Sequence, residues 1–206
     1  MIVVAISGAS GPIMGVRLIE ELLNSEEKVA AIVSQPARQI IEYEILREKI
    51  SFSSLKELLA QRGRAGNYDL LSEFKNNDFF APVASGSTKF EAMIVIPCSM
   101  KTLSAIVHGY ANSLITRTCD VALKEKRRCI IVPRETPLSV VHTENIHRAA
   151  LAGIEIVPPV PGFYTRPESV DDVVNFVVGK VLNLLGREHD LFESWGKKEI
   201  KNGASG

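Results

Sequence analysis

Short apolar runs alternate along this chain with stretches in which apolar residues recur at helical spacing. Each run holds four or five mostly β-branched residues, which is typical of a strand buried in a parallel sheet, and the runs cover 2–6, 29–33, 92–96, 129–132 and 154–157. Helical spacing predicts helices over 14–23, 36–47, 53–62, 102–126 with a break near Gly109, from about 144 onward, and 170–185. The polar stretch 62–77 predicts a loop or a weak helix.

This β-α alternation predicts an α/β fold, namely a doubly wound, mostly parallel sheet with helices on both faces, of the Rossmann or flavodoxin-like kind. The chain shows no internal repeat and no second core, so we expect one domain over 1–206 with a polar tail from about 187. In such sheets ligands bind outside the carboxyl ends of the strands, where the strand order reverses. The residues that follow the strands are therefore the candidates for a site.

Composition narrows the classes of function. The 206 residues are 46% hydrophobic, and 24 Lys and Arg balance 24 Asp and Glu, so no basic surface suggests a nucleic acid partner. The sequence contains no run of about 18 apolar residues, so we expect no membrane span. The chain enters its first strand without a charged leader, so we expect a cytoplasmic protein. The three cysteines form no CxxC pair and the four histidines do not cluster, which argues against a metal site.

Two loops of small residues could hold an anion. The first, 7–11, joins a strand to a helix, where backbone N–H groups and the helix dipole favour negative charge. Its glycines do not follow GxGxxG, so a mononucleotide or the edge of a flavin fits better than a dinucleotide; the alternative is a plain tight turn. The second loop, 84–89, is rich in hydroxyls and could equally be a flexible linker.

Two further strand ends carry polar side chains. Ser99 and Thr102 begin a helix with hydroxyls three residues apart, which suits either an N-cap or a phosphate site. Arg134 and Glu135 lie between Pro133 and Pro137 on a stiffened loop, which suits a site better than solvation. The alternative for this pair is an ordinary surface ion pair.

Four other side chains stand out in the second half of the chain. Arg117 and Lys124 are seven residues apart and share a helix face, either at a ligand or in solvent. Lys180 falls in an apolar helix, where it either extends to the surface or serves a ligand. Trp195, the only tryptophan, lies in the tail and would cover its own or a neighbour's surface.

Taken together, these motifs resemble the flavin prenyltransferases, the UbiX family, within the flavin-containing cysteine decarboxylase superfamily. The resemblance covers nearly the whole chain and rests on the order and spacing of six segments, at 7–11, 84–87, 97–99, 120–125, 133–137 and 161–164. It implies a metal-independent enzyme that joins a dimethylallyl group, from dimethylallyl monophosphate, to N5 and C6 of reduced FMN. The prenylated FMN would pass to a UbiD-type decarboxylase. The resemblance further implies a homododecamer and a role in ubiquinone biosynthesis.

The resemblance also implies roles for individual residues. The positions expected to hold FMN, with Ser10 near N5, are Gly8, Ala9, Ser10, Ser34, Ser99, Met100, Lys101, Thr102, Arg117 and Arg134. Those expected at the prenyl donor, with Tyr164 and Lys180 reaching in from a neighbouring subunit, are Glu44, Ser85, Gly86, Lys124, Tyr164, Lys180 and Trp195. The catalytic group would be Ser10, Lys124, Arg134 and Glu135.

The residue types suit that chemistry. Lys124, Arg134 and Lys180 could stabilise the departing phosphate without a metal, and Glu135 could carry the proton that C6 sheds. Two positions depart from many relatives, since Gln35 stands where Lys is frequent and Lys180 where several have Arg.

Two alternatives remain open at this point. One is an FMN-dependent decarboxylase of a cysteine-containing substrate, but those enzymes use a His upstream of the third strand, and the first His here is His108. The other is a non-catalytic flavin-binding protein, which would have no use for cations around a second phosphate.

Overall fold

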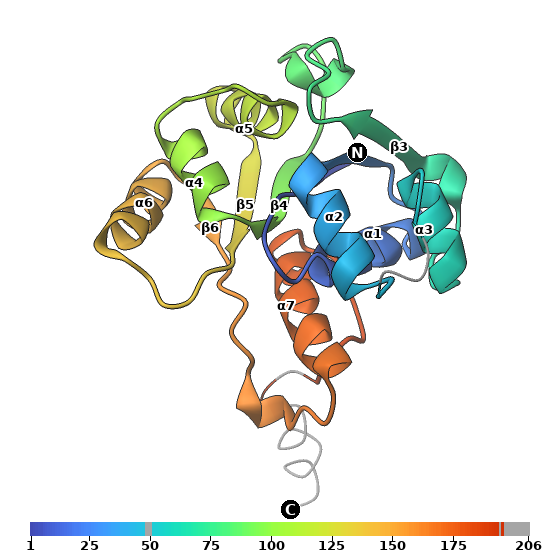
Figure 1. Ribbon diagram of the computed structural model, residues 1–206. Coiled ribbons are helices and arrows are strands. Elements are labelled where there is room, and N and C mark those ends of the chain that lie inside the picture. Colours follow the sequence, from blue (N-terminus) through green and yellow to red (C-terminus); the bar gives the residue numbers. More distant parts are fainter. Residues whose placement is uncertain (48–50, 194, 196–206) are drawn as a thin grey trace, which may run out of the picture.

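The computed structural model describes residues 1–47, 51–193 and 195 (Figure 1). Within them, six parallel strands form one sheet in the order β3-β2-β1-β4-β5-β6. The strands are β1 Ile2–Ile6, β2 Val29–Val33, β3 Leu71–Lys75, β4 Ala92–Cys98, β5 Arg128–Pro133 and β6 Glu155–Ile156. The order reverses between β1 and β4, which makes the carboxyl ends of these two strands the switch point of the sheet. The expected doubly wound fold is confirmed.

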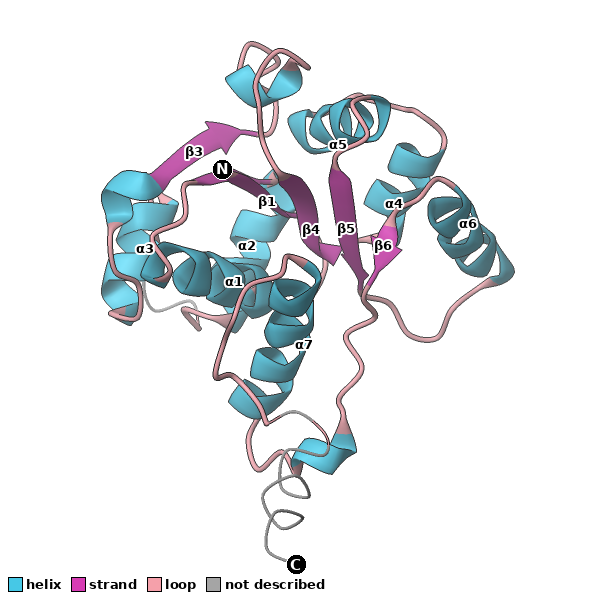
Figure 2. Cartoon of the chain, turned by 180° about the vertical axis from the view of Figure 1, so that it is seen from behind, coloured by secondary structure: helices cyan, strands magenta, loops and turns pink. Residues whose placement is uncertain are grey.

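Helices follow the strands and cover both faces of the sheet (Figure 2). They are α1 Ile13–Asn24, α2 Gln35–Glu44, α3 Leu55–Arg62, α4 Met100–Val107, α5 Leu114–Lys124, α6 Val140–Leu151 and α7 Val170–Leu184, with short 3₁₀ turns η1 Tyr68–Leu70, η2 Pro82–Ala84 and η3 Phe163–Thr165. A serine hydroxyl caps the start of six of these α-helices, which satisfies N–H groups that would otherwise lack a partner.

The sheet separates two hydrophobic cores. Ile2, Val4 and Ile6 of β1 face the core formed with α1, α2, α3 and α7. Val3 and Ala5 point to the other face, where α4, α5 and α6 pack. Because side chains alternate along a strand, one continuous apolar run supplies both cores. Gly15 lets α1 approach the switch point, since a Cβ there would lie 2.3 Å from the carbonyl oxygen of Ile96.

The expectation of a loop or weak helix over 62–77 was wrong at its second half. Leu71–Lys75 forms the edge strand β3, which pairs in parallel with β2. Its polar composition hides it, because only Leu71 is fully buried and the other side chains are half-buried or exposed. The pairing is supported by Glu73, which forms an ion pair with Arg38 of α2 and accepts from the N–H of Leu55 at 2.8 Å.

The helix boundaries also differ in detail. The segment expected at 102–126 is two helices, and the break falls as expected at Gly109, which has a positive φ of 67°. The helix expected from about 144 begins at Val140, because Ser139 and His142 form a capping box. The last helix is confirmed, while the end of the polar tail, 196–206, lies outside the described residues.

Candidate functional site at the switch point

One serine connects the ends of the two central strands. The hydroxyl of Ser7, directly after β1, donates to the carbonyl oxygen of Pro97 in β4 at 2.9 Å and accepts from the N–H of Ser99 at 2.8 Å. Ser7 is buried, so these bonds are shielded from water. The first turn and the start of α4 are thereby held side by side.

The loop 8–11 is shaped by close backbone contacts. A Cβ on Gly8 would lie 2.6 Å from Cβ of Pro36, so only glycine lets this loop approach the start of α2. Gly11 has a positive φ of 86°, and its N–H donates to the carboxylate of Glu44 at 2.9 Å. Ser34 caps α2 by accepting from the N–H of Ala37 at 3.2 Å. The loop therefore brings Ser10, Ser34 and Glu44 to one edge of the sheet.

A cavity of about 710 Å³ opens beside this loop. Its polar lining includes Ser10, Glu44 and Arg134, and its apolar wall comes from Val173, Val174 and Val177 of α7. Polar groups that converge beside an apolar wall are typical of a site for a small organic molecule.

Arg134 follows β5 at the same edge. Its backbone N–H donates to the carbonyl oxygen of Cys98 at 3.0 Å, which fixes it beside the end of β4. Its side-chain Nε is buried and finds no hydrogen-bond partner among the described residues. A buried guanidinium donor without a partner is costly, so its position favours an anionic ligand.

Several neighbouring polar residues form hydrogen bonds within their own turns. Ser99 caps α4 by accepting from the N–H of Thr102 at 3.2 Å, and the two hydroxyls lie 2.9 Å apart, so the N-cap interpretation is confirmed. In the same turn Met100 is buried and Lys101 is exposed. Glu135 is exposed and accepts from the N–H of Thr136 at 3.1 Å. In the part of the chain that the structure describes, Glu135 forms no ion pair with Arg134, contrary to the alternative of a surface pair.

A second group of expected site residues gathers where the loop 84–88 meets α5. Arg117 donates from Nε to the carbonyl oxygen of Ala84 at 3.1 Å and forms an ion pair with Asp120 at 2.7 Å. A Cβ on Gly86 would lie 3.0 Å from Nζ of Lys124. Arg127 donates to the carbonyl oxygen of Gly86 at 2.7 Å. Hydrogen bonds from Arg117 and Arg127 thus hold the loop 84–88 in place, contrary to the alternative of a flexible linker.

Lys124 has an acidic neighbour at this place. Its Nζ lies 2.8 Å from the carboxylate of Glu125. The hydrogen bond from Lys124 holds the pKa of the Glu125 carboxyl below its ordinary value, with the charge of Lys124 acting in the same direction. Glu125 therefore stays ionised and competes for Lys124 with any anionic ligand.

One chain does not bring Lys124 to Arg134. Lys124 ends α5 just before β5, whereas Arg134 follows directly after that strand. Six strand residues at roughly 3.3 Å each put the two cations on the order of 20 Å apart, at opposite ends of the sheet. In Figure 1, α5 lies in the upper part of the molecule and α7 runs from the centre downward, and the two helices pack on opposite faces of the sheet.

A third group lies where η3 and the tail meet α7. The rings of Tyr164 and Trp195 are 5.3 Å apart, edge to face, and Tyr164 is 5.9 Å from Phe176. Nζ of Lys180 lies 5.6 Å from the centre of the Phe176 ring. Trp195 thus contacts its own chain, one of the two positions expected for it.

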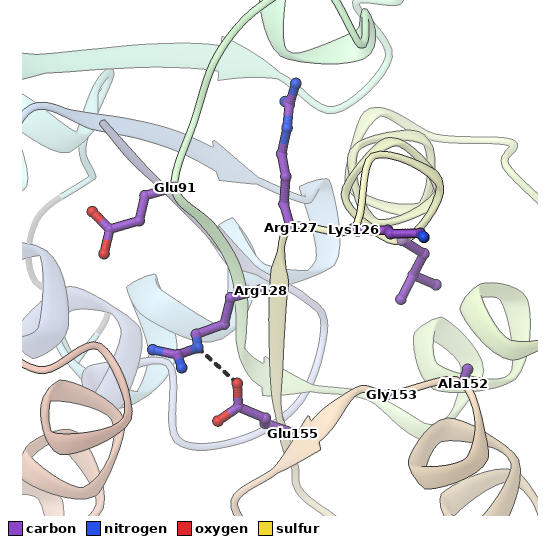
Figure 3. A pocket seen from close by; sticks show the side chains of 8 residues that line it. Glu91, Lys126, Arg127, Arg128, Ala152, Gly153 and Glu155 are labelled. Atoms are coloured by element: carbon purple, nitrogen blue, oxygen red, sulfur yellow. Dashed lines mark ion pairs between the residues drawn. The ribbon is translucent and has the colours of Figure 1, made fainter.

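A separate pocket of about 560 Å³ lies at the amino ends of β4, β5 and β6 (Figure 3). Its charges are largely satisfied, since Arg128 forms an ion pair with Glu155 at 2.8 Å and Arg127 donates to backbone carbonyls. It lies at the wrong end of the strands for a switch-point ligand.

Some residues that support the site could not be identified from the sequence. Ser7, Pro36 and Glu125 each touch a site residue, but a serine in a turn, a proline at a helix start and a surface glutamate carry no distinctive spacing. No three His, Cys, Asp or Glu side chains within the described residues gather closely enough to hold a metal ion. None of the helices in the described ranges is long and apolar enough to cross a membrane.

Comparison with known proteins agrees with this geometry. The model of the family described as Flavoprotein matches residues 1–182. The chain is 46% identical over 195 residues to a protein of Methanocaldococcus jannaschii named flavin prenyltransferase UbiX, covering 95% of this chain and 98% of that protein.

Solved structures give the same result. The crystal structure of AnUbiX (PadA1) in complex with FMN and dimethylallyl pyrophosphate has a TM-score of 0.83 at 39% identity, covering 95% of this chain and 96% of that one. A dodecameric FMN-dependent UbiX-like decarboxylase from Escherichia coli O157:H7 has a TM-score of 0.81 at 38% identity, with 94% and 98% covered.

Proposed function

Because the chain belongs to the Flavoprotein family and, within it, to the UbiX flavin prenyltransferases, we propose that it joins the dimethylallyl group of dimethylallyl monophosphate to N5 and C6 of reduced FMN. It is an enzyme of the transferase class and its flavin is FMN. The observation that carries the proposal is the cavity at the switch point, where Ser10, Glu44 and Arg134 converge beside an apolar wall. The buried Nε of Arg134 has no hydrogen-bond partner among the described residues.

The residues at this edge fit a flavin. Gly8 lets the loop 8–11 pack closely against Pro36 at the start of α2, and the N-terminus of α4 offers N–H groups and a favourable dipole to a phosphate. Residues Gly8 to Ser10, Ser34, Ser99 to Thr102 and Arg134 would hold FMN, with Ser10 near N5. When bound, reduced FMN supplies the two ring atoms that accept the five-carbon unit.

The cations would act on the prenyl donor. Breaking an allylic C–O bond leaves negative charge on the phosphate, which Arg134, Lys124 and Lys180 would stabilise by preorganised charge. Ser85, Gly86 and Tyr164 would complete the phosphate site, and Arg117 would hold the loop that carries Ser85. Glu135 would accept the proton that C6 releases when the fourth ring closes.

This site requires more than one copy of the chain. Lys124 lies on the order of 20 Å from Arg134 in one chain by strand length, so a neighbour must supply one of the two for both to reach one phosphate. Tyr164 and Lys180 would likewise reach in from a neighbouring subunit. A dodecamer satisfies this need, as in the E. coli structure named dodecameric. A UbiD-type decarboxylase would receive the product, and ubiquinone biosynthesis would be the pathway served.

The alternatives gain no support. The decarboxylases of cysteine-containing substrates need a His before the third predicted strand, β4, whereas His108 closes α4 and is exposed. A carrier of flavin has no use for the cations of a second phosphate site.

Mixing two inactive variants tests the shared site. Lys124→Ala and Arg134→Ala, dissociated and reassembled together, should regain part of the prenyl transfer that each lacks alone, because some sites then hold both cations. If the reassembled mixture were as inactive as either variant alone, a site shared between subunits would be contradicted. Running the wild type with dimethylallyl monophosphate and with the diphosphate identifies the donor.

A further inference from the structure

The described part of the tail folds back onto α7 through a compact group of rings. Phe176 and Phe192 have ring centres 4.9 Å apart, and His189 lies 5.0 Å from Phe192. Phe176 in turn contacts Tyr164, which contacts Trp195. Phe176 is only 8% exposed and therefore forms the buried centre of this aromatic cluster.

Gly179 allows the tail to approach. A Cβ at this position would lie 2.5 Å from Cε1 of Phe192 and 2.7 Å from Cε1 of His189. Glycine in the middle of a helix is unfavourable relative to alanine, so its presence in α7 is explained by this close contact and not by helix propensity. Gly162 has the same function on the other side, since a Cβ there would lie 2.6 Å from Cζ of Phe176.

His189 sets the direction of the tail. Its Nδ1 accepts from the N–H of Leu191 at 3.2 Å, so in the neutral ring the proton is on Nε2, which is buried beside Gly179. This turn delivers Phe192 to the surface of α7 immediately beside Lys180.

Lys180 lies over both rings. Its Nζ is 5.6 Å from the ring centre of Phe176 and 5.8 Å from that of Phe192. A lysine ammonium on a flexible four-carbon stem is attracted to aromatic faces, and two faces restrict its positions more than one. Lys180 is exposed, and it forms no ion pair with any described carboxylate. The rings are therefore what orients its charge.

We infer that Phe176 and Phe192 are positioning residues that hold the Lys180 ammonium toward the phosphate of the prenyl donor, and that the contact of His189 and Phe192 with Gly179 docks the tail that brings Trp195 to Tyr164. The role at the phosphate rests on the proposed function. The docking of the tail does not, and it has its own readout in Trp195, the only tryptophan.

The test uses the full-length FMN-bound protein. Phe192→Leu keeps an apolar side chain and removes one face below Lys180, so KM for dimethylallyl monophosphate should rise about three- to tenfold while FMN affinity is unchanged. Trp195 is already 79% exposed, so the readout is its edge-to-face contact with Tyr164, and the near-UV circular dichroism of the indole should weaken when that contact is lost. Phe163→Leu is the matched control, because Phe163 is exposed on η3 and has no ring contact among the described residues.

A second variant separates docking from folding. Gly179→Ala raises the helix propensity of α7 but expels Phe192 and His189, so we expect a melting temperature no lower than wild type together with a weaker near-UV circular dichroism of Trp195 and a raised KM. Wild-type turnover with unchanged KM and an unchanged near-UV circular dichroism of Trp195 in both variants would overturn the inference. A wild type that transfers no prenyl group would overturn the proposed function instead, and the Trp195 readout would still report on the tail.

Discussion

Ser7 and Ser99 share one hydrogen bond that joins the carboxyl ends of β1 and β4: the N–H of Ser99 donates to the hydroxyl of Ser7 at 2.8 Å. The same hydroxyl donates to Pro97 at 2.9 Å, so both of its roles are used. The loop of small residues and the capped start of α4 thus form one unit, although Ser7 and Ser99 are 92 positions apart in the chain.

Ser7→Ala should weaken flavin binding and lower stability together. The substitution leaves the N–H of Ser99 without its partner, whereas the carbonyl oxygen of Pro97 still accepts from the backbone N–H of Ser7 at 3.2 Å, so we expect a cost of about 1–3 kcal/mol. Thermal unfolding and a titration with FMN measure the two effects. Ser72→Ala, on the exposed edge of β3, is the control and should change neither. Unchanged FMN affinity in Ser7→Ala would show that FMN binding does not depend on the hydrogen bonds that join the ends of β1 and β4.

Arg134→Lys should bind FMN or the prenyl donor less tightly despite the conserved charge. Lysine cannot supply the donor that Nε of Arg134 offers in its buried position. Loss of one charge-assisted hydrogen bond corresponds to about 1.5–3 kcal/mol, or more than tenfold in affinity. Calorimetric titration of each ligand shows which one Arg134 serves. Wild-type affinity for both would remove Arg134 from the site.

Glu125→Gln should lower KM for the prenyl donor. The carboxylate of Glu125 lies 2.8 Å from Nζ of Lys124, and its lowered pKa keeps it ionised at neutral pH. Removing that charge frees Lys124 for phosphate. Steady-state kinetics over a range of donor concentrations measure the change, with Glu26→Gln on an exposed turn as the control. A raised KM would mean that Glu125 orients Lys124 instead of competing for it.

Glu135→Gln should slow product formation far more than it weakens FMN binding. Glutamine keeps the shape of the side chain but cannot accept the proton released at C6. Single-turnover kinetics followed by flavin absorption separate the two effects. Turnover at the wild-type rate would remove Glu135 from the mechanism.

Stability should fall at alkaline pH through two buried thiols. Burial raises the pKa of Cys98, and hydrogen bonding to Cys129 together with burial raises that of Cys119. The folded state then holds these protons more tightly than the unfolded state. The stability that these thiols contribute is fully present below their pKa in the unfolded state, about 8.5. It is lost as the pH rises from there toward their pKa values in the folded state. Denaturant unfolding from neutral to alkaline pH measures the loss in free energy of unfolding, and Cys98→Ala should reduce that loss. If the free energy of unfolding fell equally steeply with pH in Cys98→Ala, Cys98 would not contribute to the pH dependence.

Strands buried on both faces could be predicted from the sequence, and β3 could not. In β1, β2, β4 and β5 the apolar run is continuous because helices cover both faces. Leu71–Lys75 lies at the edge, and its Glu73 is used in an ion pair with Arg38, so its pattern resembles a loop. Pairing with β2, a tertiary contact, decides its conformation.

The sequence could suggest candidate site residues, but it could not show how they are arranged in space. Turn and cap chemistry indicated Gly8, Ser99 and Arg134, and the strand-end rule placed them at one edge. Spacing along α5 correctly put Arg117 and Lys124 on one helix, yet it could not show that Lys124 lies at the opposite end of the sheet from Arg134. Contacts between distant segments, such as Phe192 against Gly179, leave no local pattern.

Prenyl transfer to FMN is tested most directly by the mass of flavin extracted after anaerobic incubation of the wild type with reduced FMN and dimethylallyl monophosphate. We expect FMN enlarged by one five-carbon unit, and loss of the label when the FMN carries deuterium at C6. Unmodified FMN recovered from protein that binds both FMN and the donor would contradict it.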